Sequence, residues 1–389
     1  MLSRRMLLTT GMASLVVGGL GALWWTSTSP ATRAREPWKR AGESLGDHRL
    51  DALAYAILAP TPHNMQPWRV ELTGKSGFTL FCDQDRLLPE TDPPHRQITI
   101  GFGCFLELYR QAAAELGYRA GIAYFPQGQS ESALDERPIA QVELVPDAAV
   151  EKDPLFTAIL ARRTSRLPYD LGRLPGEAAL GQLEASGGTG MSVGTTIDEV
   201  KVREIRDLAT RAWETEWASD GPRRETIRVT QVGRSAVDAR PWGITLDDRF
   251  VSTMGRLGFM DGEAMDDPAS RAYRETLSFY AKSIAATPAF LWLTSPDNTR
   301  ATQIEVGRAW VRIQLKATSL GLSFQPLSQA LQEFSEMAPH YRAAHELLGR
   351  RGETVQLLAR IGYGPAIGPA PREALASKLV PMGHRERLA

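Results

Sequence analysis

The sequence predicts an α+β protein that consists of two related halves. Its 389 residues exceed what one small hydrophobic core requires, and they suit two domains or one large pseudo-symmetric domain. Two apolar segments with helical periodicity, residues 103–117 and 307–321, each start at a glycine and end at a Leu-Gly pair with the same spacing. An extended segment with a proline, Pro126 or Pro326, follows each. We interpret them as an internal repeat; the alternative is two ordinary amphipathic helices with glycine caps.

The N-terminal residues 1–34 have the pattern of an export signal. Arg4 and Arg5 precede a long, moderately apolar stretch, which leads into mostly small residues with Ala-x-Ala-like cleavage options. Paired arginines are typical of twin-arginine signals, which export folded proteins and are compatible with a cofactor loaded in the cytoplasm. The alternative is an uncleaved anchor, because the stretch is about long enough to span a bilayer. We therefore expect the protein in the periplasm or on the outer face of the cytoplasmic membrane.

A proline-rich loop follows the predicted linker of residues 35–47 and the first apolar helix, residues 50–58. The loop, residues 59–68, reads Ala-Pro-Thr-Pro-His-Asn-Met-Gln-Pro-Trp and leads into a strand-like hairpin. Its prolines fix φ and remove backbone donors, so the amides of Asn64 and Gln66 are held on a rigid turn. A stiff loop with polar amides suits a planar, polar ligand. The alternative is a proline-rich joint that carries a core tryptophan.

A basic cluster opens the second half of the chain. A short helix, residues 156–161, leads into residues 162–166, which read Arg-Arg-Thr-Ser-Arg. Guanidinium groups bind a phosphate through two hydrogen bonds each, and hydroxyl groups bind the remaining oxygens. The cluster therefore predicts a phosphate site, and a solvated basic helix terminus is the alternative.

The remaining segments alternate strand-like and helical patterns. Strands are predicted at residues 192–196, 286–294 and 355–363, and a long amphipathic helix from about Glu199 to Trp217. This alternation supports the α+β prediction.

These motifs together resemble the nitroreductase-like flavoproteins. The loop is similar to the Pro-Ser-x-x-Asn-x-Gln-Pro-Trp element of that family, with Thr61 in place of the serine, and the basic cluster resembles its Arg-x-Ser-x-Arg signature. The match spans most of residues 48–375 and is closest to the Acg branch, which carries two such halves in one chain. The resemblance implies a nitroreductase-like fold, with a mainly antiparallel sheet flanked by helices in each half, arranged like a fused dimer.

The resemblance also implies FMN as the cofactor, and it nominates a set of contact residues. The residues expected to bind FMN are Pro60, Thr61, Pro62, Asn64, Gln66, Arg162, Thr164, Arg166, Pro326, Leu327, Ser328 and Arg372.

The two halves are expected to contribute different parts of one site. Only the first half carries the amide loop, and only the second carries the basic cluster, so one complete FMN site is expected per chain. Ser328 stands where much of the family has glutamate, which leaves the tuning of the flavin ring open. By resemblance, residues 220–275 form a lid. The predicted boundaries are 1–34 for the signal, 35–150 for half one and 151–389 for half two.

The charge balance and the positions of the cysteines and histidines argue against several other functions. Lysine plus arginine and aspartate plus glutamate number 45 each, so bulk charge does not favour a nucleic-acid partner. Cys82 and Cys104 are expected to be buried apolar residues, although one bridge between them is an alternative. His340 and His345 point to different sides of a helix, so no metal site is expected.

The sequence leaves several functions open. The first is an FMN oxidoreductase that reduces nitro, quinone or related acceptors in a ping-pong cycle, with NAD(P)H or a redox partner protein as the donor. The second is a protein that binds or sequesters FMN with little turnover. A third, weaker alternative is a binding protein without any cofactor. In the first two cases we expect a monomer that acts as a fused pseudo-dimer.

Overall fold

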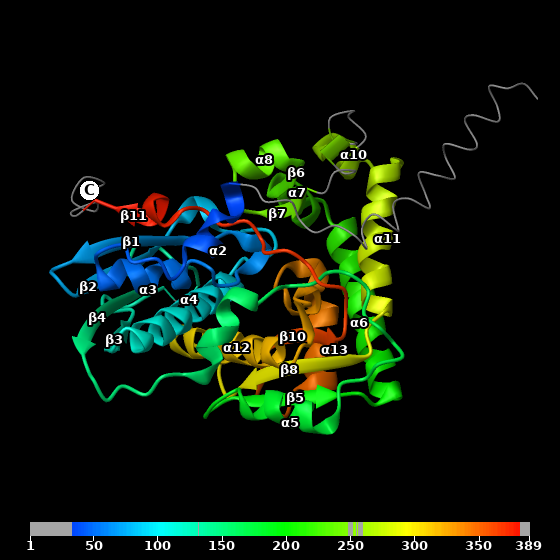
Figure 1. Cartoon of the computed structure of the whole chain (residues 1–389). Coiled ribbons are helices and arrows are strands. Elements are labelled where there is room, and N and C mark those ends of the chain that lie inside the picture. Colours follow the sequence, from blue (N-terminus) through cyan, green and yellow to red (C-terminus); the bar gives the residue numbers. More distant parts are fainter. Residues whose placement is uncertain (1–32, 131, 248–251, 254, 256–259, 382–389) are drawn as a thin grey trace, which may run out of the picture.

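The computed structural model describes residues 33–130, 132–247, 252–253, 255 and 260–381 (Figure 1). The predicted export signal, apart from its last two residues, lies outside this part. Within the described part, no helix combines the length and apolar character needed to cross a bilayer.

Two antiparallel sheets with the same strand order form the two halves. The first runs β1-β2-β4-β3 and the second β5-β8-β10-β9, so each places its first, second, fourth and third strand side by side. In each sheet one long helix joins the second strand to the third: α4 (Arg96–Glu115) in the first, and in the second α12 (Arg300–Ser319). The predicted internal repeat is therefore confirmed. The strands are β1 Trp68–Thr73, β2 Gly77–Cys82, β3 Tyr118–Tyr124, β4 Ala140–Pro146, β5 Ser192–Thr196, β8 Ala289–Ser295, β9 Ser323–Pro326 and β10 Thr354–Gly362.

Helices α4 and α12 lie between the two sheets and cross at the two repeat glycines (Figure 1). A Cβ atom on Gly103 would stand 2.0 Å from the carbonyl oxygen of Ile304 and 2.8 Å from the Cα of Gly307. A Cβ atom on Gly307 would stand 1.9 Å from the carbonyl oxygen of Ile100 and 2.8 Å from the Cα of Gly103. The contact is reciprocal, as in a two-fold symmetric dimer interface, and it leaves no room for a side chain on either helix.

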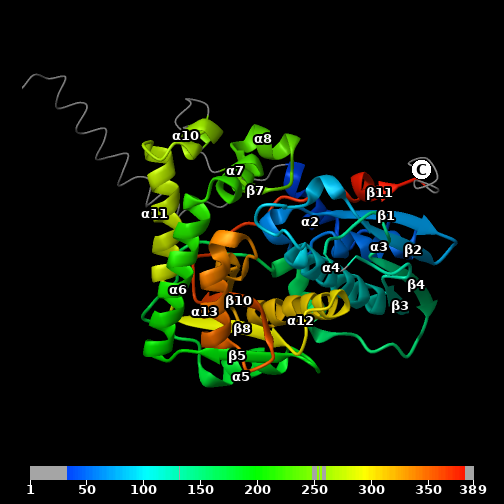
Figure 2. The ribbon, with the colours of Figure 1, turned by 180° about the vertical axis from the view of Figure 1, so that it is seen from behind.

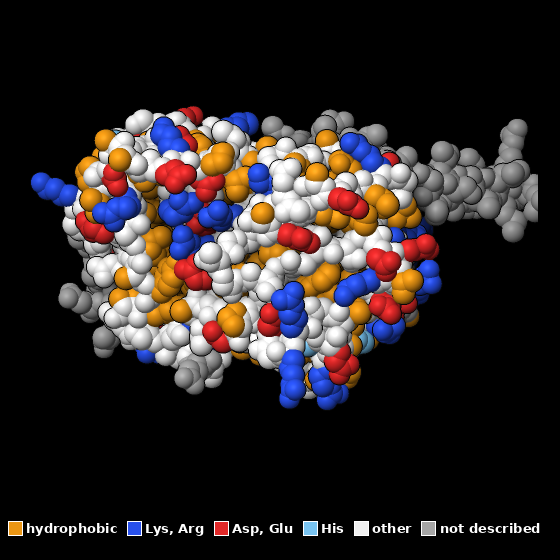
Figure 3. Space-filling model, turned by 90° about the horizontal axis from the view of Figure 1, so that it is seen from below, with side chains coloured by type: hydrophobic (Ala, Val, Ile, Leu, Met, Phe, Trp, Pro, Cys, Tyr) orange, Lys and Arg blue, Asp and Glu red, His pale blue; other side chains and the backbone are white. Residues whose placement is uncertain are grey.

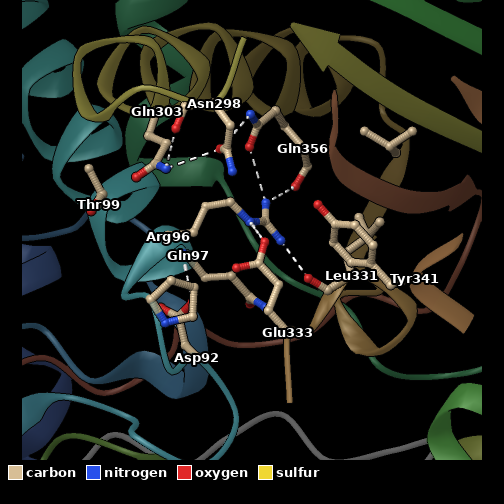
Figure 4. Close-up of polar contacts among 12 residues, drawn as sticks. Asp92, Arg96, Gln97, Thr99, Asn298, Gln303, Leu331, Glu333, Tyr341 and Gln356 are labelled. Carbon is tan, nitrogen blue, oxygen red and sulfur yellow. Dashed lines mark hydrogen bonds and ion pairs between the residues drawn. The ribbon is translucent and has the colours of Figure 1, made fainter. Parts of the chain in front are cut away.

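Each of these helices begins with a buried arginine that reaches into the other half. Arg96 donates from Nη1 to the Gln356 carbonyl (2.8 Å) and pairs through Nε with Glu333 (2.9 Å), as Figure 4 shows. Arg300, at the equivalent position of α12, donates from Nη1 to Thr99 Oγ1 (3.1 Å). A buried guanidinium group that loses its partners is costly, so the two arginines fix the halves against each other.

The two helices start earlier than the sequence predicted. The expected starts were Gly103 and Gly307, whereas α4 and α12 each gain seven residues. Capping explains the difference, because Asp92 accepts hydrogen bonds from the backbone N–H groups of Gln97 (3.0 Å) and Ile98 (2.9 Å). Thr299 caps α12 in the same way.

Half two differs from half one by a long insertion. It joins β5 to β8, at the place where half one has the short turn between β1 and β2. Its long helices α6 (Glu199–Ala218) and α11 (Arg271–Ala285) lie side by side in both Figure 1 and Figure 2. The segment 220–275, which the resemblance predicts to be a lid, contains regular elements: α7 Asp220–Arg228, β6 Thr230–Val232, α8 Arg234–Ala239, β7 Ile244–Leu246 and α10 Gly262–Asp266.

The N-terminal end of the described chain contacts the insertion of half two, and the C-terminal end joins the sheet of half one. The prediction of a linker over residues 35–47 is wrong, since α2 (Glu36–Arg40) buries Trp38 and Arg35 forms an ion pair with Asp247 (2.8 Å). The last strand, β11 (Leu379–Val380), crosses from half two and pairs in parallel with β1. The other α-helices in the described part of the chain are α3 His48–Ala56, α5 Glu177–Ala185 and α13 Ala338–Leu348. Short 3₁₀ turns also occur, including η4 Pro154–Ala161.

The glycine crossing gives the first testable prediction. We expect Gly103→Ala or Gly307→Ala to lower the free energy of unfolding by about 3 kcal/mol, because the new methyl group overlaps a backbone that cannot move aside. Urea unfolding measures the change. The control is Gly181→Ala in α5, where nothing lies within 4 Å of the new Cβ; it should stabilise by about 0.5–1 kcal/mol. Equal effects of the three substitutions would contradict the prediction.

Candidate functional site

A cavity of about 250 Å³ lies between the amide loop of half one and the basic cluster of half two. Ten of the twelve predicted cofactor-binding residues line it. Gln66 and Leu327 do not, and both are buried behind the wall. The ten lining residues are Pro60, Thr61, Pro62, Asn64, Arg162, Thr164, Arg166, Pro326, Ser328 and Arg372.

The amide loop has an unusual backbone. His63, Asn64 and Gln66 have φ values of 45°, 57° and 51°, in the left-handed region that non-glycine residues seldom occupy. Such conformations cost free energy and persist only where surrounding contacts hold them, which is common at binding sites. The loop therefore presents a rigid, preformed surface to the cavity.

Gln66 supplies much of the support for this backbone. Its Nε2 donates to the Pro241 carbonyl (2.9 Å), and its Oε1 accepts from the backbone N–H of Glu373 (2.9 Å). Its own carbonyl accepts a hydrogen bond from the buried ammonium group of Lys378 (2.8 Å). Gln66 thus ties the loop to the insertion and to the C-terminal segment, and its side chain does not reach the cavity.

Asn64 and Arg372 join the loop to the basic cluster. The Nη1 of Arg372 donates to Asn64 Oδ1 (2.6 Å), and its Nη2 donates to the carbonyls of Leu58 and Ala59 (3.0 Å each). Arg162 donates from Nη2 to the same Leu58 carbonyl (2.9 Å). Two guanidinium groups from distant parts of half two therefore converge on the chain that leaves α3.

Two arginines of the basic cluster, Arg162 and Arg163, join Arg372 around the indole ring of Trp38. Their Cζ atoms lie 5.7, 5.0 and 5.4 Å from the ring centroid, so all three make cation–π contacts with one ring. No described residue gives any of the three a carboxylate partner. The fourth arginine, Arg166, is exposed at the cavity wall.

Burial makes this concentration of positive charge costly. Desolvation, with a further contribution from Arg163, lowers the pKa of Arg162 to about 10. Desolvation and then the charges of Arg162 and Arg163 hold the pKa of Arg372 well below its ordinary value. The Nε atoms of Arg162 and Arg372 are buried and have no hydrogen-bond partner. Uncompensated buried charge with free donors is the arrangement that an anion would complete.

His63 adds a neutral group to the cavity wall. Desolvation, and then the charge of Arg166, lowers the pKa of His63 to about 4, so the imidazole is uncharged at neutral pH. Its Nδ1 is buried without a partner. The ring can therefore offer a hydrogen bond to a bound molecule without adding charge.

The far wall of the cavity is aromatic and comes from the insertion. Trp213 on α6 lies 5.2 Å from the ring of Trp217 and 4.6 Å from that of Tyr280 on α11. The side chain of Gln325 donates to the Tyr280 hydroxyl (3.0 Å). Arginine side chains and aromatic rings both line the cavity, as an anionic molecule with a planar ring would require.

Several residues of this site were not predicted from the sequence. Gln325 and Gln329 flank the nominated segment of residues 326–328, whereas the others come from segments without a motif and are brought to the loop only by the fold. The sequence held two signals for these residues. Trp38 stands next to basic residues, and Trp213 and Trp217, four positions apart, lie on the same face of a helix. The missed lining residues include Trp38, Trp213, Glu216, Trp217, Tyr280, Gln325 and Gln329.

The cysteines and the two histidines of α13 have local contacts outside the cavity. Cys82 and Cys104 are free and buried, as expected. No cluster of potential metal ligands occurs in the described part of the chain. His345 accepts a hydrogen bond from the Val355 backbone (3.0 Å), and His340 bonds Thr215 (2.9 Å). Basic and acidic side chains alternate on the face seen in Figure 3, in keeping with the balanced charge.

Comparisons with known proteins agree with the motifs. No protein-family model matches the chain. "Putative NAD(P)H nitroreductase Rv3131" of Mycobacterium tuberculosis is 28% identical over 331 residues, which cover 83% of this chain and 88% of that protein. "Putative NAD(P)H nitroreductase acg" of the same organism is 37% identical over 120 residues, which cover 30% of this chain and 34% of that protein. The predicted resemblance to the nitroreductase-like flavoproteins is confirmed.

The nitroreductase-like fold class is confirmed with it, because each half has an antiparallel sheet flanked by helices. Among solved structures, a nitroreductase with bound FMN from Bacteroides fragilis is 15% identical, with a TM-score of 0.34. That comparison covers 58% of this chain and 97% of the Bacteroides chain.

The uncompensated arginines give a prediction that needs no cofactor. We expect inorganic phosphate to raise the melting temperature of the apoprotein relative to chloride at equal ionic strength, because an anion that binds the folded state stabilises it. Arg162→Gln should remove most of this increase. Arg203→Gln is the control, since Arg203 is exposed on α6 and pairs only with Glu199 among its ion-pair contacts in the described chain. A phosphate effect that survives Arg162→Gln would contradict the assignment.

Proposed function

We propose that the protein is an FMN-dependent oxidoreductase of the nitroreductase type. The observation that carries the proposal is the buried cluster of arginines without carboxylate partners, at one end of a cavity whose other walls are amide and aromatic. FMN has the matching chemistry, a terminal phosphate joined by a polar chain to a planar ring. The relatives named as NAD(P)H nitroreductases support the same function.

The residues at the cavity fit this cofactor. Arg162, Arg166 and Arg372 would bind the phosphate, and Thr164 would donate a hydroxyl group to the phosphate or the ribityl chain. The rigid amide loop and the segment that carries Pro326 and Ser328 would contact the ring. Bound FMN would supply two-electron transfer to and from small molecules.

The reaction follows from the expected cofactor. We propose a ping-pong cycle in which a donor reduces the bound flavin and leaves before a nitro, quinone or related acceptor enters. The aromatic wall would exclude water from the cavity, and the amide loop would orient the ring. NAD(P)H is the donor suggested by the names of the relatives, and a redox partner protein is the alternative for an exported enzyme.

A second function is favoured by one specific observation. The insertion covers the cavity with residues of α7, β6, β7 and α10, among them Ile227, Thr230, Ile244 and Met265. A covered flavin could be held without efficient turnover, as in a protein that sequesters FMN. Rapid mixing with NADPH, NADH and dithionite separates the two functions. Flavin that dithionite reduces, but that nicotinamides cannot reduce and quinones cannot reoxidise, would favour sequestration.

The cofactor assignment gives a direct test. We expect the purified protein to show a flavin absorbance spectrum, or to acquire one when FMN is added. Arg162→Gln should weaken FMN binding by about 10- to 100-fold, the loss expected for one charge-assisted contact. Fluorescence titration measures the affinity, with Arg203→Gln as the control. A colourless protein that does not bind added FMN would refute the proposal.

The location of the protein gives a separate test. We propose that the N-terminal segment directs export of the folded protein, on the basis of Arg4 and Arg5 before the apolar stretch. Replacement of both arginines by lysine should retain the protein in the cytoplasm. Immunoblots of cell fractions measure the distribution, with Lys39→Arg as the control. Export that is unaffected by the double replacement would contradict a twin-arginine route.

A further inference from the structure

The aromatic wall of the cavity contains one acidic side chain, Glu216. It lies on α6 between Trp213 and Trp217, and all three line the cavity. The residue is 1% exposed, and no described residue forms an ion pair with it. An ionised carboxylate without a cation is costly at such a position, so the neutral acid is favoured.

The neighbours of Glu216 act in opposite directions: hydrogen bonds favour the charged form, whereas burial and a nearby like charge favour the neutral form. Its Oε1 accepts a hydrogen bond from Thr226 Oγ1 (3.3 Å), and its Oε2 accepts one from Gln332 Nε2 (3.2 Å). The charged and titratable groups that face it are Glu225 on α7, a like charge, and Tyr280 on α11. Desolvation, opposed in part by hydrogen bonds and reinforced by Glu225, raises the pKa of Glu216 to about 7.

The direction of this pKa shift determines the pH range in which Glu216 carries a proton. A carboxyl group with a pKa near 7 keeps its proton below that pH and loses it as the pH rises through about 7. Thr226, Gln332 and Gln329 hydrogen-bond the carboxyl group from within the protein. Because Glu216 also lines the cavity, a bound molecule can reach the carboxyl group and accept its proton.

We propose that Glu216 is the acid that delivers a proton to the electron acceptor. The inference rests on the proposed oxidoreductase function and adds a catalytic residue to it. It also favours a class of acceptor: a planar, uncharged molecule that stacks on the tryptophans and directs an oxygen, such as a quinone carbonyl, at the carboxyl group.

The chemistry balances without any further reactant. Reduction of a quinone to a hydroquinone requires one hydride, which reduced FMN supplies, and one proton. The O–H bond of Glu216 breaks, a new O–H bond forms on the quinone oxygen, and the carboxylate that remains regains a proton from solvent. The two electrons travel with the hydride, so the carboxyl group undergoes no redox change.

The test uses the FMN-loaded protein and two glutamine variants. Protein reduced with dithionite is mixed with 1,4-benzoquinone at pH values on both sides of about 7, and flavin reoxidation is followed by absorbance. Wild-type protein should slow as the pH rises through about 7. Glu216→Gln should be slower by about 100-fold at the lower pH values and lose this dependence. The control is Glu214→Gln, an exposed residue on the same helix, which should behave as wild type.

Two readouts besides turnover complete the test. FMN affinity should be unchanged in Glu216→Gln, since the hydrogen-bond partners of the carboxyl group in the described chain are neutral side chains and not the arginines. Infrared difference spectra should show a protonated carboxyl band in wild type below about pH 7 that is missing from Glu216→Gln. Absence of that band from wild type would overturn the proposal even if no reaction were measured.

The outcomes separate this proposal from the proposed function. If wild type is reoxidised and Glu216→Gln follows the same pH profile at the same rate, only the role of Glu216 is refuted. If wild-type protein binds no FMN, or binds it and is not reoxidised by the quinone, the oxidoreductase function itself fails, and the proton-donor role fails with it.

Discussion

The contact between Gly103 and Gly307 is the constraint on which the rest of the structure depends. It lets α4 and α12 approach until the Cα of each glycine lies within 2.8 Å of the site where the other would carry its Cβ. Because the contact is reciprocal, it relates the two halves in the way a two-fold axis relates two subunits. The buried arginines at the starts of the helices then lock this arrangement with hydrogen bonds across the seam.

The site depends on this contact between α4 and α12. Neither half contains both the amide loop and the arginine cluster, so the cavity is complete only when the helices cross at the right depth. Trp38 and the C-terminal segment that carries Arg372 then close the arginine end. The insertion between β5 and β8 closes the opposite end with aromatic side chains. The described part of half one has no counterpart of this insertion. The wall formed by Trp213, Trp217 and Tyr280 therefore comes from half two alone.

Buried charge without compensation is the feature that gives the cavity its chemistry. At one end, Arg162 and Arg372 keep free donors and no carboxylate, and a phosphate would satisfy both. Elsewhere on the wall, burial and then the charge of Glu225 raise the pKa of Glu216 to about 7, so the carboxyl group keeps its proton below that pH. The separation of these groups matters, since an ion pair between Glu216 and an arginine would cancel both properties.

Local features of the fold could be predicted from the residues alone. Prolines and glycines marked the rigid loop and the helix ends, periodicity marked the strands and helices, and matched glycine spacing marked the repeat, because these signals act over a few residues. Only the tertiary structure decided what faces the cavity. Gln66 belongs to the same motif as Asn64 yet turns away to hold the loop, while Trp38 and Glu216 carry no motif and reach the site. Orientation of this kind depends on contacts between residues far apart in the chain, and local sequence does not contain them.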